Sequence, residues 1–139
     1  MAYVPAGLVL EHFRTPQHAG AFPVGTPDVV EGRAGQARLG REIHIQLQID
    51  ADGRIADCRY RVYGCPATIA LCSLASERLP GMSLAEAADW RGMALFRELE
   101  LPAEKRPAVL VLEDAVRAAV QRYNMDNQPA TAGTDTGRD

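Results

Sequence analysis

Hydrophobic and polar residues alternate along the middle of the chain, and this alternation predicts a small antiparallel sheet. Isoleucine or leucine occupies every second position from 43 to 49, as in a strand with one buried face. The same alternation over residues 55–62 predicts a second strand, and Asp52-Gly53 between the two is a strong hairpin signal. A shorter apolar run at 28–32 predicts a strand before these two. We therefore expect a three-stranded antiparallel meander.

Apolar residues at helical spacing flank the predicted strands on both sides. One helix is predicted over residues 4–14, and four follow the strands, at 66–79, after Ser83, at 92–100 and from Pro107 to about Asn124. Ser83 and Glu86 have the spacing of a capping box. Because the strands precede most of the helices, we expect an α+β sandwich with the helices packed on one face of the sheet. Residues 1–124 would form one domain, and residues 125–139, which have little to bury, a disordered C-terminal tail.

The chemically most informative stretch is Tyr63-Gly64-Cys65-Pro66, where the last predicted strand passes into a helix. Proline favours the first helical position, so Cys65 would directly precede the helix. The positive end of a helix dipole stabilises an anion at that place. A thiolate is both a nucleophile and a metal ligand, so Cys65 is the candidate functional residue. A small, buried and inert cysteine after a tight turn is the alternative interpretation, and the local pattern leaves both open.

The other two cysteines are expected to lie in the core. Cys58 falls on the buried face of its strand, and Cys72 lies on a helix that is apolar nearly all round. Cys72 is two helical turns from Cys65, a rise of about 10 Å, which is too far for both sulfurs to hold one ion. A zinc site that combines Cys65 with a histidine is a weaker alternative, because zinc ligands usually come in close pairs. The histidines considered for it are His12, which we expect to pack in the core, His18 and His44.

Composition excludes several classes of function. The net charge of -3 and the pI near 5.6 argue against a general nucleic-acid binder. The sequence has no apolar run long enough to span a membrane and no signal-peptide pattern, and three cysteines without a disulfide framework indicate a reducing cytoplasm. Phosphate loops, nucleophile elbows and paired-histidine helices are also missing from the sequence, so hydrolytic and phosphoryl-transfer enzymes find no support.

Three stretches carry a family resemblance. Residues 9–16 with Gly20, the Tyr63-Gly64-Cys65 turn and residues 113–119 together resemble the IscU/NifU-type iron–sulfur cluster assembly scaffolds, over about Tyr3 to Tyr123. The resemblance implies a scaffold rather than an enzyme, on which a [2Fe-2S] cluster is built with sulfur from a cysteine desulfurase. In that family three cysteines carry the site, with an aspartate near the first and often a histidine beside the third.

This sequence departs from the family at four of the site positions. Leu39 stands where the first cysteine is expected, and Arg41 where the aspartate is expected. Pro107-Ala108 aligns with the histidine and the third cysteine, so Cys65 is the one family ligand that remains. The chaperone-recognition segment aligns with residues 101–105 and differs at two central residues, which argues against chaperone docking.

Two hypotheses about function follow from this pattern. The first is participation in iron–sulfur cluster assembly with a degenerate site, where Cys65 accepts sulfur as a persulfide or contributes one ligand to iron or to a cluster. Such a cluster would be shared by two chains in a homodimer and completed by outside thiols, since clusters usually need four ligands. The second is a metal-free pseudo-scaffold, without a cofactor, that binds and regulates a cysteine desulfurase or another partner.

Overall fold

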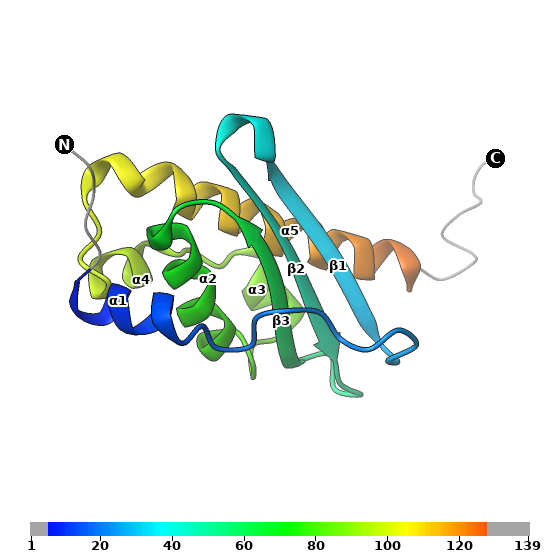
Figure 1. Ribbon diagram of the computed structural model, residues 1–139. Coiled ribbons are helices and arrows are strands. Elements are labelled where there is room, and N and C mark those ends of the chain that lie inside the picture. Colours follow the sequence, from blue (N-terminus) through cyan, green and yellow to red (C-terminus); the bar gives the residue numbers. More distant parts are fainter. Residues whose placement is uncertain (1–5, 128–139) are drawn as a thin grey trace.

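The computed structural model describes residues 6–127, which fold as an α+β sandwich (Figure 1). Three strands are followed by most of the helices, as the pattern of the sequence predicts. The elements in chain order are α1 (Gly7–Arg14), β1 (Val29–Gln36), the 3-10 helix η1 (Ala37–Leu39), β2 (Arg41–Ile49), β3 (Ile55–Tyr63), α2 (Pro66–Arg78), α3 (Leu84–Ala88), α4 (Met93–Glu98), the 3-10 helix η2 (Ala103–Lys105) and α5 (Arg106–Asp126).

The sheet is an antiparallel meander in the order β1-β2-β3, which confirms the predicted topology. Its register pairs Leu47 with Val30 on one side and with Cys58 on the other, and all three side chains are buried. Residues 44, 46 and 48 point to the opposite, polar face. β1 extends four residues beyond its predicted end, because its glycine-containing second half pairs with β2 as far as Gln36 although it has no apolar alternation.

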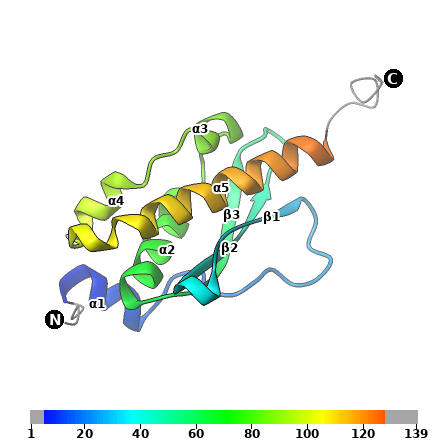
Figure 2. The same cartoon turned by 90° about the horizontal axis from the view of Figure 1, so that it is seen from above.

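Helices α2 and α5 cover the apolar face of the sheet, which confirms that the helices pack on one face (Figures 1 and 2). The long helix α5 runs across β1 and β2, and its backbone comes very close to β1 at Gly32. A Cβ atom on Gly32 would lie 2.1 Å from the carbonyl oxygen of Ala115 and 2.4 Å from the backbone nitrogen of Ala119. Glycine at this position therefore allows the backbones of α5 and β1 to touch.

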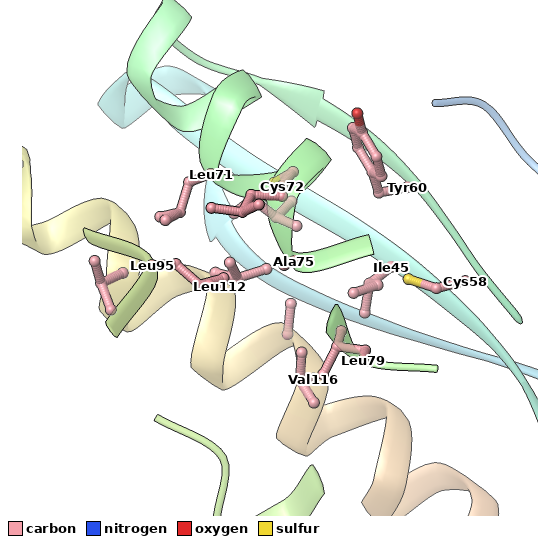
Figure 3. Packing of buried hydrophobic residues seen from close by; sticks show 14 of the residues in the cluster. Ile45, Cys58, Tyr60, Leu71, Cys72, Ala75, Leu79, Leu95, Leu112 and Val116 are labelled. Atoms are coloured by element: carbon pink, nitrogen blue, oxygen red, sulfur yellow. The ribbon is translucent and has the colours of Figure 1, made fainter. Parts of the chain in front are cut away.

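The core fills the space between the sheet and these two helices (Figure 3). Cys58 and Cys72 both lie inside it with at most 2% of their surface exposed, as expected from their positions in the sequence. Residues that contribute to the same cluster from different elements are Ile45, Leu71, Ala75, Leu79, Leu95, Leu112 and Val116.

The segment between α1 and β1 follows β3, the strand at one edge of the sheet. The backbone N–H of Gly20 donates to the carbonyl of Tyr60 at 2.8 Å, and the N–H of Phe22 donates to the Gln46 side chain at 2.8 Å. Helix α1 itself packs against α2, where His12 is buried and its Nδ1 lies 2.7 Å from the Ser73 hydroxyl. His12 is therefore a core residue, as predicted.

The later helices agree with the sequence except at their ends. The capping box of Ser83 and Glu86 is present in both directions at the start of α3. Helix α4 is shorter than predicted, and α5 continues two residues past Asn124 to Asp126. Most of the predicted tail, residues 128–139, lies outside the described part of the chain, so the disorder of the tail stays a prediction.

Candidate functional site

Cys65 lies at the turn between β3 and α2. The last register pair of β2 and β3 joins Glu42 to Tyr63, after which the chain leaves the sheet at Gly64. Cys65 is the N-cap residue of α2, with extended backbone angles (φ -80°, ψ 169°), and Pro66 is the first helical residue. This is the arrangement that the sequence predicts. The side chain of Cys65 is partly exposed, so its sulfur is accessible to a reactant.

The surroundings of Cys65 favour a thiolate. Partial burial raises the pKa of this thiol, but the Thr68 hydroxyl, the Thr68 backbone N–H, the charge of Lys105 and the Ala67 backbone N–H together outweigh burial. The pKa of Cys65 therefore lies below its ordinary value. The Thr68 Oγ1 atom lies 3.4 Å from the Cys65 sulfur. Positive charge and helix N-termini are the usual causes of such a shift, and they make a cysteine reactive.

The two core cysteines have the opposite character. Burial raises the pKa of Cys58 to about 12, with a further contribution from the neighbouring Asp57. Burial raises the pKa of Cys72 further. Both thiols therefore stay protonated near neutral pH, and Cys65 is the cysteine of this chain whose surroundings support nucleophilic chemistry.

The loop between β1 and β2 meets the Cys65 turn at the same end of the sheet (Figures 1 and 2). Arg41 is the first residue of β2 and directly precedes Glu42, which pairs with Tyr63 at the start of the turn. Its Nε atom is buried and has no hydrogen-bond partner among residues 6–127. Leu39, at the end of η1, exposes 68% of its surface. This loop thus brings an exposed leucine and an arginine to the turn.

The start of α5 supplies the third segment. Pro107 is exposed in its first turn, whereas Ala108 is completely buried. Lys105 is the N-cap residue of α5, and its charge acts on the Cys65 sulfur, so this end of α5 lies near the turn. The β1–β2 loop, the Cys65 turn and the start of α5 therefore lie close together, as a shared site requires. Among the side chains at the expected site positions, however, only Cys65 is a metal ligand.

These residues do not fit an iron–sulfur cluster held by one chain. A cluster is usually bound by four ligands, mostly thiolates, and this end of the sheet provides one. Within residues 6–127, no group of three or more His, Cys, Asp or Glu residues is arranged to hold a metal ion. The histidines have other partners, which are Ser73 for His12, Ser76 for His18 and Glu42 for His44. The zinc alternative therefore finds no support in the geometry.

Sequence reasoning missed two residues that act on Cys65. Thr68 stands three residues after the N-cap Cys65. At this spacing a side chain in the first helical turn reaches back toward the cap residue, so the sequence does carry a signal for the contact of Thr68 with Cys65. Lys105 lies forty positions along the chain from Cys65, and tertiary packing of α5 brings it to the turn. No local pattern in the sequence marks it.

An α+β sandwich with a partly exposed thiol at a strand-to-helix turn defines the class of this protein. Residues 6–130 match the family model described as "NifU-like N terminal domain". The chain belongs to this family, as the resemblance in the sequence indicated. No helix within residues 6–127 is long and apolar enough to cross a membrane.

Named relatives and solved structures agree with the assignment. The "Iron-sulfur cluster assembly scaffold protein IscU" of Azotobacter vinelandii is 34% identical over 123 residues, which cover 88% of this chain and 94% of the relative. The "Iron-sulfur cluster assembly enzyme IscU" of Drosophila melanogaster is 32% identical over 124 residues, 89% of this chain and 80% of the relative. The crystal structure of a NifU-like N-terminal protein from Brucella abortus has a TM-score of 0.67 at 17% identity, covering 86% of this chain and 94% of its own, and shows the same fold.

Proposed function

We propose that this protein takes part in iron–sulfur cluster assembly as a scaffold-type sulfur carrier, and that Cys65 is the residue that accepts the sulfur. The family and the names of its relatives support the process. The observation that carries the specific role is the surroundings of Cys65, which favour the thiolate in a chain that retains one family ligand. The chain acts here as a carrier that is loaded and unloaded, and not as an enzyme.

The transfer needs one reactive thiol. The Cys65 thiolate attacks the outer sulfur of a persulfide on the donor, a cysteine desulfurase, and a new S–S bond forms on Cys65. The S–S bond of the donor breaks, and its electron pair leaves with the donor thiolate. The exchange involves no net oxidation and no additional reactant. The partly exposed sulfur at the turn gives the donor access to Cys65.

The charges near the turn support sulfur rather than metal as the cargo. The charge of Lys105 acts on the Cys65 sulfur. Arg41, next to the residue that pairs with Tyr63, occupies the position at which the family resemblance leads one to expect an aspartate. Fixed positive charge favours an anionic persulfide and opposes a divalent iron ion. An exposed leucine at position 39 adds no ligand.

The test is loading by the donor. The purified protein is incubated with a cysteine desulfurase and L-cysteine, alkylated and digested. Mass spectrometry of the peptides then detects the mass of one added sulfur atom. We expect the added sulfur on the Cys65 peptide of the wild type, and none in Cys65→Ser. Cys58→Ser and Cys72→Ser are the matched controls and should load like the wild type. An unloaded wild type, or loading that is unchanged in Cys65→Ser, would show that the proposal is wrong.

Two other outcomes would redirect the assignment. Anaerobic incubation with ferrous iron and sulfide that gives a stable chromophore, lost in Cys65→Ser, would favour a cluster shared between two chains, and size exclusion would show the dimer. Desulfurase that binds Cys65→Ser as well as the wild type, and changes its turnover without loading sulfur, would favour the metal-free regulator. Support for this second function comes from positions 39, 41, 107 and 108, where the family resemblance implies site residues that this sequence lacks.

A further inference from the structure

The hydroxyl group of Thr68 is directed at the sulfur of Cys65 from inside the protein. Thr68 is completely buried in the first turn of α2, and its Oγ1 atom lies 3.4 Å from the sulfur. Within residues 6–127, the Cys65 sulfur is the hydrogen-bond partner of this hydroxyl. A buried hydroxyl without a partner is costly, and a thiolate accepts hydrogen bonds but cannot donate them. The Thr68 O–H therefore donates to Cys65 whenever the sulfur is charged.

Packing fixes the position of this hydroxyl. A Cβ atom on Gly64 would lie 3.0 Å from the Cβ of Thr68 and 3.2 Å from its Oγ1, so the glycine leaves just enough room for the threonine. Threonine is branched at Cβ and has few allowed rotamers, especially within a helix. The donor is thus held in place before any reaction begins, which is the condition under which a hydrogen bond contributes most to a transition state.

Charge appears on the Cys65 sulfur when the cargo leaves. In the persulfide, the Cys65 sulfur is the inner atom and the outer sulfur carries the negative charge. When an acceptor nucleophile attacks the outer sulfur, the bond between the two sulfurs breaks and its electron pair goes to Cys65, which departs as a thiolate. A hydrogen bond that strengthens as this charge develops lowers the barrier to release.

We propose that the Thr68 hydroxyl stabilises Cys65 as the leaving group, so that this turn is adapted to hand sulfur on to a nucleophilic acceptor rather than to retain it. The inference rests on the proposed sulfur-carrier function. Thr68 then makes a direct hydrogen bond to a reacting atom. The release of sulfur from Cys65 depends on this residue more than the acceptance of sulfur does.

The test measures release separately from loading by the desulfurase. Wild type, Thr68→Val and Thr68→Ser are loaded to completion with inorganic polysulfide, desalted, and mixed with excess sodium cyanide. Cyanide takes the outer sulfur as thiocyanate and leaves the Cys65 thiolate, so the rate of thiocyanate formation reports release. Valine has nearly the shape of threonine without the hydroxyl, and serine keeps the hydroxyl. Cys65→Ser is the blank.

We expect Thr68→Val to slow thiocyanate formation about three- to tenfold, the range that corresponds to the net contribution of one typical hydrogen bond. Thr68→Ser should stay within about twofold of the wild type, because it restores the donor. A valine variant as fast as the wild type would overturn the inference, and so would a serine variant as slow as valine, since that result would assign the effect to packing. If the desulfurase fails to load the wild type, the proposed function is wrong, whereas the cyanide rates still decide the role of Thr68.

Discussion

The reactivities of the three cysteines should differ by orders of magnitude in the native protein. Burial raises the pKa of Cys58 to about 12, so at pH 7 about one molecule in 100,000 carries its thiolate. The pKa of Cys65 lies below the reference value of 9.0, so more than about one molecule in 100 carries the Cys65 thiolate at the same pH. Because the thiolate is the nucleophile, ionisation alone should make Cys65 at least about 1,000-fold more reactive than Cys58.

Alkylation with iodoacetamide measures this difference. The native protein is exposed to the reagent at pH 7, samples are quenched over time, and peptide mass spectrometry follows each cysteine separately. We expect Cys65 to be modified first, and Cys58 and Cys72 to react slowly, at a rate set by opening of the structure. In denaturant the three cysteines should react at similar rates, which is the control. Modification of Cys58 or Cys72 as fast as Cys65 in the native protein would refute the reasoning.

Three further predictions concern stability. Gly32→Ala should force α5 away from β1 and lower the free energy of unfolding by about 3 kcal/mol. The control, Gly40→Ala, should lower it by about 1 kcal/mol, because a Cβ atom there meets open space and the cost comes from the left-handed backbone (φ 95°). Equal losses in denaturant titrations would contradict the close approach of α5 and β1. Ser83→Ala should cost about 1 kcal/mol through loss of the capping box, and a melting temperature equal to that of the wild type would contradict it. Burial raises the pKa of Asp57, but hydrogen bonds from Arg59 and from the backbone N–H of residue 58 outweigh it and hold the pKa of this carboxyl below 3.8. Asp57 therefore stabilises the fold above about pH 4, and this contribution is lost as the pH falls through the folded pKa of Asp57. Asp57→Asn should make the melting temperature depend less on pH in the acidic range. An unchanged dependence would count against the pairing of Asp57 with Arg59.

The sheet was readable from the sequence where one face is apolar and the other polar. Residues 43–49 alternate without interruption, and the apolar ones, at 43, 45, 47 and 49, form the buried face of β2. The second half of β1 is not predicted, because its residues from Arg33 to Gln36 carry no alternation. Its strand conformation is set by pairing with β2 and by the contact of Gly32 with α5, which are interactions with distant parts of the chain. Non-local pairing of this kind leaves no periodic signal in a single sequence.

The candidate site was readable in part for a similar reason. The turn before α2 depends on neighbours in the sequence, glycine at 64 and proline at 66, so the position of Cys65 at the start of the helix followed from local rules. The electrostatic character of the thiol depends in addition on Lys105, which the packing of α5 places near it. Local sequence therefore predicted where the thiol lies and which cysteine is the candidate, whereas the tertiary structure was needed to show that its surroundings lower its pKa.

The positions near Cys65 differ in burial, and burial determines how freely the side chain at each position could change. Leu39 exposes 68% of its surface, so a different side chain at this position would disturb little of the packing. Ala108 is different, because it lies on the buried side of α5 and is completely buried, so a larger side chain there would have to be accommodated by the core. The surface of the site can thus change its charge and its chemistry while the sandwich beneath it is preserved, as expected when function depends on side chains placed at the ends of strands and helices. Cys65 belongs to both the fold and the site, since the turn that starts α2 also exposes the Cys65 sulfur to a partner.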